Sequence, residues 1–310
     1  MTAMGRGNRM VATAEHVAPL RVKDLKSGVK PIWCPGCGDY SILSSFFQVI
    51  INLKLDPAKV AVVSGIGCSG RFPAFARVYG FHGVHGRALP TATGLKAARP
   101  DLTVFAMSGD GDAFSIGGGH IAHAARRNVD ITYIVMDNEI YGLTKGQPSA
   151  TSPPDILELS ISGKTKGNRK GMVGLLDIHK VEEALNPILM ALAYNASFVA
   201  RAFSGRPKEL TAIIEEGVRH KGFSFIQVMS PCVTFFNTYN HFRETVAPLP
   251  EDHDPSDRMR AIALAMEPDK TYVGIFYRDE TRPSLGERLE EYRQQLSPTS
   301  MEELLARFTR

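Results

Sequence analysis

Cysteine, tryptophan and long apolar runs are all scarce in this sequence. Only four of its 310 residues are cysteine and one is tryptophan. No stretch reaches the roughly 18 apolar residues of a membrane span, and residues 1–20 lack the apolar segment of a secretory signal. We therefore expect a soluble, cytoplasmic chain, in which disulfides are rare and cysteines serve metal binding, redox chemistry or packing.

Charge of one sign is not concentrated anywhere along the chain. The 36 basic and 32 acidic residues give a formal net charge of +4, without a long basic block. This balance gives no reason to propose nucleic-acid binding, although it leaves acidic partners open. The hydrophobic content of 44% is enough to fill a sizeable core.

Changes in composition divide the chain into three parts. Residues 1–30, with several glycines and a proline, are typical of an extended arm, and residues 31–245 are predicted to form one α/β domain. Prolines and acids mark the start of residues 246–310, which we predict to be a helical extension covering another subunit or a cluster. Two capping boxes support its helices: Ser284 with Glu287, and Ser300 with Glu303.

The most informative stretch places polar turns directly after two apolar runs. Leu102–Met107 and Ile131–Met136 are predicted to be buried parallel strands, and Gly117–Asn128 suits the crossover helix between them. Such a unit belongs to a doubly wound, mostly parallel sheet, which binds its ligands at the carboxyl ends of the strands. Asp110 and Asn138 both fall at that edge.

Oxygen ligands at this edge indicate a hard cation. Gly109 and Gly111 let the backbone approach a phosphate, while Asp110 offers a carboxylate, Asn138 an amide oxygen and Ile140 a backbone carbonyl. Magnesium takes few protein oxygens and completes its octahedron with water and phosphate oxygens. The pattern therefore predicts Mg²⁺ carrying a diphosphate, although Gly-Asp-Gly alone also occurs as an ordinary turn.

These motifs together resemble a known family. Gly-Asp-Gly, followed in the next strand's turn by Asn, is similar to the thiamine diphosphate signature. The stretch from Asp137 to Gln147, DNEIYGLTKGQ, narrows the resemblance to the β subunit of 2-oxoacid:ferredoxin oxidoreductases, most like the 2-oxoglutarate type. The resemblance implies cofactor contacts at Gly67, Cys68, His85, Gly86, Gly109, Asp110, Gly111, Asp112, Asn138, Ile140, Gly142, Leu143 and Thr144.

The four cysteines lie in turns that the predicted sheet brings toward one edge. Cys34 and Cys37 form a Cys-Pro-Gly-Cys pair, and Cys68 and Cys232 each follow a predicted strand. Four thiolates near a redox-capable cofactor suit a [4Fe-4S] cluster, but ligand identity alone leaves a structural zinc ion equally open. The resemblance favours iron and sulfur, because the family carries its cluster on cysteines in this arrangement.

Two basic residues are candidates for substrate binding. Arg71 follows the third cysteine, and Lys145 stands on the loop after Asn138. Either cation suits the distal carboxylate of a dicarboxylic 2-oxoacid, and the resemblance supports this use. Solvent-facing side chains are the competing interpretation for both, as packing is for His85.

The resemblance implies an enzyme with half of its active site elsewhere. Its expected activity is oxidative decarboxylation of 2-oxoglutarate to succinyl-CoA and CO₂, or the reverse, with ferredoxin and coenzyme A as co-substrates. A separate α subunit is implied to supply the glutamate that activates the aminopyrimidine, in an αβ or (αβ)₂ assembly. The alternatives are a pyruvate or broad 2-oxoacid enzyme, a non-oxidative thiamine diphosphate decarboxylase with structural zinc, and a scaffold subunit without turnover.

The remaining periodicities predict the rest of the sheet and its helices. Further strands are predicted at 61–64, 197–200 and 223–229, which makes about five, with helices at 39–52, 181–194 and 207–220. Residues 149–170 are predicted to be a long loop over the site or a partner surface.

Overall fold

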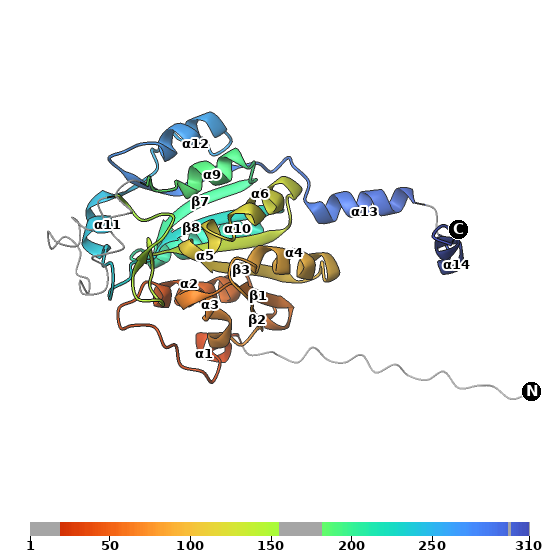
Figure 1. Cartoon of the computed structure of the whole chain (residues 1–310), viewed down its shortest axis with the longest axis horizontal. Helices are drawn as coiled ribbons and strands as arrows, with labels where there is room; N and C mark the ends of the chain where they lie inside the picture. The colour runs from red at the N-terminus through yellow and green to blue at the C-terminus, as the bar shows by residue number, and fades with distance from the viewer. Residues whose placement is uncertain (1–18, 155–181, 297–298, 310) are drawn as a thin grey trace, which may run out of the picture.

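The centre of the protein is an eight-stranded, mostly parallel sheet (Figure 1). The computed structural model describes residues 19–154, 182–296 and 299–309. The strand order is β2-β1-β3-β4-β8-β7-β10-β9, and only the β7 to β10 pairing is antiparallel. The sheet strands are β1 (Val60–Ser64), β2 (Tyr79–His82), β3 (Thr103–Gly109), β4 (Ile131–Asp137), β7 (Phe198–Phe203), β8 (Phe223–Met229), β9 (Val246–Pro248) and β10 (Thr271–Arg278).

Helices cover both faces of this sheet. Helices α4, α6, α9 and α12 pack on one face, and α2 and α10 pack on the other. The helices are α1 (Val22–Leu25), α2 (Asp39–Asn52), α3 (Gly67–Gly70), α4 (Ala88–Ala98), α5 (Asp110–Phe114), α6 (Gly118–Arg127), α9 (Pro187–Ala193), α10 (Pro207–Arg219), α11 (Tyr239–Thr245), α12 (Arg258–Ala265), α13 (Leu285–Gln295) and α14 (Met301–Ala306). A short hairpin of β5 (Ile140–Tyr141) and β6 (Gln147–Pro148) lies outside the main sheet.

Burial on both faces explains why the central strands read as continuous apolar runs. In β4, Tyr133 and Val135 join the core under α6 and α9, while Ile134 and Met136 join the core under α2 and α10. All seven residues of β4 and all seven of β8 are buried, so neither strand has a face open to solvent. The predicted doubly wound fold is confirmed.

Most predicted elements appear close to their expected bounds. Strands β3, β4 and β8 and helices α2, α6 and α10 match the predicted ranges within two residues. The helix predicted at 181–194 begins later, at Pro187, because the Asn186 side chain caps it by accepting from the Leu189 amide at 3.1 Å. Residue 181 lies outside the described residues.

Three strands of the sheet were not predicted. The expected five strands omit β2, β9 and β10. Strands β9 and β10 come from the segment predicted to be a helical extension, so the boundary at residue 245 does not coincide with the edge of the sheet. In the predicted arm, residues 19–30 include the short helix α1, and residues 1–18 lie outside the described residues.

The last two helices lead away from the sheet (Figure 1). Both capping boxes are present: Ser284 Oγ accepts from the Glu287 amide at 3.3 Å, and Ser300 Oγ from the Glu303 amide at 3.1 Å. The apolar face of α13 is largely exposed, with Tyr292 59% accessible. Among the described residues, no helix is long and apolar enough to cross a membrane. The loop predicted at 149–170 is described only as far as residue 154.

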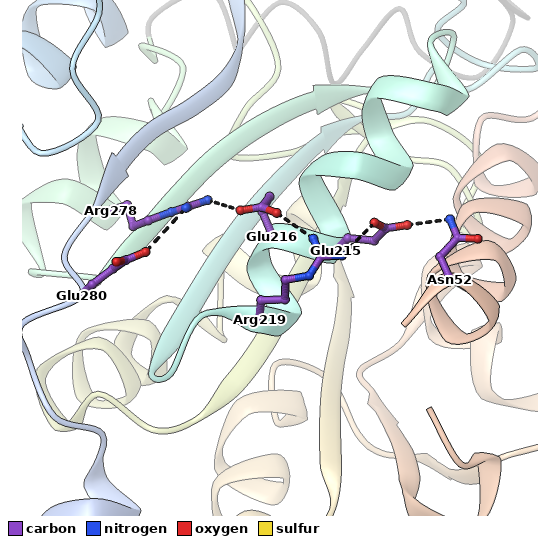
Figure 2. A network of polar contacts seen from close by, with 6 residues as sticks. All are labelled: Asn52, Glu215, Glu216, Arg219, Arg278 and Glu280. Atoms are coloured by element: carbon purple, nitrogen blue, oxygen red, sulfur yellow. Dashed lines mark hydrogen bonds and ion pairs between the residues drawn. The ribbon is translucent and has the colours of Figure 1, made fainter. Parts of the chain in front are cut away.

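A chain of polar contacts, which we call the surface network, ties α10 to its neighbours (Figure 2). Asn52 at the end of α2 donates to Glu215 at 2.7 Å, and Glu216 accepts from Arg278 of β10 at 2.6 Å. Arg219 bridges Glu215 and Glu216 within α10. The six residues of the surface network are Asn52, Glu215, Glu216, Arg219, Arg278 and Glu280.

Candidate active site

Two of the predicted cation ligands meet at the carboxyl ends of neighbouring strands. Strand β3 ends at Gly109, whose register partner in β4 is Met136, so the following turns lie side by side. Asp110 is the first residue of α5, and its Oδ1 accepts from the Asn138 amide at 3.4 Å. The Asn138 side chain holds its own loop in place, because its Oδ1 accepts from the Ile140 amide at 3.1 Å.

The Gly-Asp-Gly turn is closed against Tyr141. A Cβ on Gly111 would lie 2.3 Å from Tyr141 Cε1, so only glycine fits there. The Tyr141 hydroxyl donates to the Gly111 carbonyl at 3.2 Å, and Ser115 Oγ lies 2.8 Å from the same hydroxyl. The β3 turn and the β5 hairpin are therefore fixed to each other across the site.

These turns line a cavity of about 420 Å³. Twelve of the residues predicted to contact the cofactor, a metal or the substrate lie on its wall: Gly67, Cys68, Arg71, Gly109, Asp110, Gly111, Asp112, Asn138, Ile140, Gly142, Leu143 and Thr144. The six other predicted residues do not line it: His85, Gly86, Lys145, Cys34, Cys37 and Cys232.

Asp112 fastens two further loops to this site. Its buried Oδ1 accepts from the amides of Ile66 at 3.1 Å and Gly86 at 2.7 Å. Among the described residues, no hydrogen-bond donor reaches its Oδ2. Gly86 is thus bonded to a residue of the cavity wall, and the Nε2 of the neighbouring His85 lies 3.4 Å from the Gly111 carbonyl oxygen.

The two predicted substrate-binding cations differ in position. Arg71 follows α3 and lines the cavity with an exposed side chain. Lys145 is exposed outside the cavity wall, at a φ of +81°, a left-handed conformation that costs a non-glycine residue free energy. The structure therefore brings Arg71, and not Lys145, to the cavity.

The cysteine-bearing turns are hydrogen-bonded to one another. Trp33, which precedes the first cysteine, donates its indole N–H to the Cys68 carbonyl at 2.8 Å. The Gly38 amide donates to the Pro231 carbonyl at 3.4 Å and so joins the Cys34–Cys37 turn to the turn of Cys232. Hydrogen bonds thus join all three cysteine-bearing segments, and of the four cysteines only Cys68 lines the cavity.

The four thiols are close enough to influence one another's ionisation. Burial, followed by the Asp39 carboxylate and then Cys232 and Cys34, raises the pKa of Cys68 to about 12. Burial also raises the pKa values of Cys37 and Cys232. A cation bound among these thiols would favour their thiolate forms.

Two kinds of metal centre are commonly bound by four thiolates. Zinc holds four thiolates at about 2.3 Å, so its ligands must nearly touch. A cubane cluster places iron and sulfide between its cysteines and accepts a wider ring of thiols.

Sequence reasoning missed a buried set of polar side chains behind Asp110, which we call the interior network: Asp110, Thr151, Asp137, Gln227 and Arg201. All five are at most 9% exposed. Burial and then the neighbouring Asp137 raise the pKa of Asp110, and burial also raises that of Asp137. The only sequence signal was the run of hydroxyls around Thr151, which falls inside the loop predicted at 149–170.

Comparisons with known proteins agree with this geometry. The family described as thiamine pyrophosphate enzyme, C-terminal TPP binding domain, matches residues 65–228, and the family of the C-terminal part of the pyruvate ferredoxin oxidoreductase beta subunit matches residues 232–294. A 2-oxoacid:ferredoxin oxidoreductase subunit beta from Saccharolobus solfataricus is 42% identical over 275 residues, covering 84% of this chain and 85% of that one. This chain belongs to the 2-oxoacid:ferredoxin oxidoreductase β subunits.

Two further proteins have similar levels of sequence identity to this chain. A 2-oxoglutarate synthase subunit KorB from Methanothermobacter marburgensis is 37% identical over 263 residues, which covers 83% of this chain and 86% of that one. The solved structure of a 2-oxoglutarate:ferredoxin oxidoreductase from Magnetococcus marinus, with 2-oxoglutarate, coenzyme A and succinyl-CoA bound, has a TM-score of 0.84 at 39% identity. The match covers 96% of this chain and 98% of that one. This β subunit therefore carries a thiamine diphosphate-binding domain.

Proposed function

We propose that this chain is the β subunit of a 2-oxoglutarate:ferredoxin oxidoreductase. In this proposal Asp110, Asn138 and the Ile140 carbonyl hold Mg²⁺ on the thiamine diphosphate, and the four cysteines hold a [4Fe-4S] cluster. One observation carries it: a Cβ on Gly142 would lie 3.7 Å from Asn138 Nδ2, 3.4 Å from Cys232 Sγ and 4.0 Å from Cys68 Sγ. Gly142 thus lies beside a proposed Mg²⁺ ligand and beside two proposed cluster ligands.

The residues around Asp110 fit a divalent cation. Two buried carboxylates, Asp110 and Asp137, lie next to each other, and only Asp110 lines the cavity. A cation bound from the cavity side offsets their mutual repulsion, which burial would otherwise make costly. The oxygen-only donor set of carboxylate, amide and carbonyl suits Mg²⁺ better than a soft metal.

The bound groups supply decarboxylation chemistry and an electron path, and the protein supplies position and charge. Tyr141 fixes the turn that carries Asp110, and Asp112 anchors the loop before Cys68 through the Ile66 amide. The proposed diphosphate site and the proposed cluster site are therefore held at a constant separation by hydrogen bonds within this chain.

Arg71 is our proposed selector for 2-oxoglutarate. It carries a permanent positive charge on the cavity wall, where the distal carboxylate of a dicarboxylic substrate would need one. Relatives with 2-oxoglutarate in their names support this choice, while others are named only for 2-oxoacids, so pyruvate or broad specificity is the competing function.

Turnover of the assembled enzyme tests the selector. Arg71→Gln is expected to lower kcat/KM for 2-oxoglutarate about tenfold or more, because one charge-assisted contact is lost, with little change for pyruvate. Lys145→Gln is the matched control and should leave the ratio unchanged. Equal losses for both substrates in Arg71→Gln would remove Arg71 as the selector.

An α subunit, ferredoxin and coenzyme A complete the proposed system. We propose that residues 31–245 hold the cofactors and that the helices of residues 246–310 contribute to an interface between subunits. Exposed apolar side chains support the latter: Leu289, Tyr292 and Leu296 of the α13 segment are 42%, 59% and 53% accessible.

Anaerobic purification with the α subunit tests the function as a whole. We expect a brown complex with about four irons and four acid-labile sulfides per β chain, bleached by 2-oxoglutarate with coenzyme A. Cys232→Ser should remove the colour while bound thiamine diphosphate remains. A colourless wild-type protein with one zinc ion would instead favour a non-oxidative decarboxylase, and absence of bound thiamine diphosphate would favour a scaffold subunit.

A further inference from the structure

The interior network contains a hydroxyl that joins two carboxylates. Thr151 Oγ1 lies 2.8 Å from Asp137 Oδ1 and 3.1 Å from Asp110 Oδ2. Thr151 is 6% exposed, and the two aspartates are 0% and 2% exposed, so water does not compete for these contacts. Thr151 lies just after the hairpin of β5 and β6. It does not line the cavity itself but contacts Asp110, which does.

A threonine hydroxyl has one proton and so donates to one carboxylate at a time. Asp137 already accepts from the Gln227 side chain at 2.7 Å and from the Glu139 amide at 3.1 Å. Asp110 also accepts from the Asn138 amide at 3.4 Å and has a side-chain hydrogen bond from Ser149. The Thr151 hydroxyl is therefore held between the two carboxylates, and its contact with Asp110 fixes one oxygen of the carboxylate that lines the cavity.

The position of Asp137 depends in turn on Arg201, a buried arginine on β7, two strands away from β4. Gln227 of β8 is the register partner of Arg201 in β7, and its Oε1 accepts from Arg201 Nε at 2.8 Å. This contact turns the Gln227 amide nitrogen toward Asp137, because the amide oxygen is already occupied. Arg201 also donates to the Tyr272 carbonyl of β10 at 3.4 Å.

We propose that Thr151 is a positioning residue for the cation site, and that Arg201, Gln227 and Asp137 hold its hydroxyl in place. This inference rests on the proposed function, in which Asp110 binds Mg²⁺. One oxygen of Asp110 is held by Thr151 from behind, so the carboxylate presents a fixed orientation to a cation in the cavity. The interior network thereby links strands β7, β8 and β4 to the turn after β3.

Magnesium binding to the apo complex of this chain with its α subunit tests the inference. Calorimetric titration with Mg²⁺ at saturating thiamine diphosphate gives the affinity without turnover. Thr151→Val removes the hydroxyl at nearly constant volume and is expected to weaken Mg²⁺ binding about 10- to 100-fold, as loss of a ligand-orienting contact does. Thr151→Ser restores the hydroxyl and should bring the affinity back to within a few-fold of wild type.

Two further variants distinguish a failure of the proposed role of Thr151 from a failure of the proposed Mg²⁺ site at Asp110. Thr211→Val makes the same change on α10, far from the cavity, and should leave Mg²⁺ affinity unchanged. Asp110→Asn should weaken it more than any Thr151 variant. Unchanged affinity in Asp110→Asn overturns the proposed cation site. A large loss in Asp110→Asn with none in Thr151→Val overturns only the role of Thr151.

A merely structural role for Thr151 gives a different pattern. In that case Thr151→Val and Thr151→Ser would lose Mg²⁺ affinity equally, in proportion to lowered thermal stability, and the inference would fail. Thr151→Ala removes the same hydroxyl without its methyl groups and replaces Thr151→Val in the titration if the valine variant does not assemble. Wild-type affinity in Thr151→Ala would overturn the inference as well.

Discussion

The interior network and the surface network contain similar groups in opposite surroundings. Both combine arginine, carboxylates and one amide side chain. No residue of the interior network is more than 9% exposed, whereas the side chains of Arg219 and Glu280 in the surface network are 53% and 73% accessible. Water can replace a lost partner at the surface but not in the interior, so the same contacts carry different energetic weight. The comparison indicates that burial, rather than the number of contacts, decides what such a network does.

Loss of Gln227 should have the largest effect on stability. Gln227→Leu leaves Arg201 Nε and Asp137 Oδ2 without their contacts in a dry interior, at about 1–3 kcal/mol for each group. We expect the free energy of unfolding to fall by about 3 kcal/mol or more, measured by urea denaturation. Gln294→Leu, on the exposed side of α13, is the matched control and should change it by less than about 0.5 kcal/mol. Equal losses of unfolding free energy in Gln227→Leu and Gln294→Leu would contradict the conclusion that burial decides the weight of these contacts.

The difference between buried and exposed regions also decides which elements could be predicted from the sequence. Strands β3, β4 and β8 were predictable because burial on both faces leaves continuous apolar runs. All four residues of β2 are exposed, so this strand carries no such signal. Asp110 and Asn138 were placed at one edge by the rule for parallel strands, but Thr151 depends on how a loop returns to the sheet. Nothing local marks Arg201 as a buried cation.

His220, at the C-terminal end of α10, should make stability depend on pH. Burial and then Arg278 lower its pKa from 6.5, and Ser197 Oγ lies 2.7 Å from its Nε2. Because the unfolded chain takes up the proton first as pH falls, the free energy of unfolding should decrease below about pH 6.5, by at most about 1.4 kcal/mol per unit. The decrease ends once pH falls below the folded-state pKa.

Thermal or urea unfolding between pH 5 and 8 measures this slope. His220→Gln keeps a side chain that can contact Ser197 but cannot titrate, so the part of the slope due to His220 should disappear. An unchanged slope in the variant would show that other groups cause it.

The ion pair of Arg278 with Glu216 should couple weakly and respond to salt. Their side chains are 26% and 35% accessible, so the pair is only partly shielded from water. A double-mutant cycle with Arg278→Met and Glu216→Gln is expected to give a coupling of about 0.5–1 kcal/mol. In 1 M NaCl the coupling should shrink, because the screening length falls to about 3 Å. A coupling energy above that range and independent of salt would show that this ion pair is shielded from water as the interior network is.

Asn52→Ala should have the smallest effect. Its contact with Glu215 joins α2 to α10 (Figure 2). Asn52 is exposed and the Glu215 side chain is 15% accessible, so water can replace the contact. We expect a change in the free energy of unfolding within about 0.5 kcal/mol. A loss of more than 1 kcal/mol by urea denaturation would show that the surface network also stabilises helix packing.

The exposure of β2 bears on how the protein behaves when it is produced alone. Within the described residues, β2 pairs only with β1, and Tyr79 and Phe81 are 60% and 53% accessible along it. An open strand with aromatic side chains offers unpaired backbone groups to any other chain, which promotes edge-to-edge aggregation. Expression of the β chain without a partner should therefore give precipitation that rises with concentration, and Phe81→Lys should delay it.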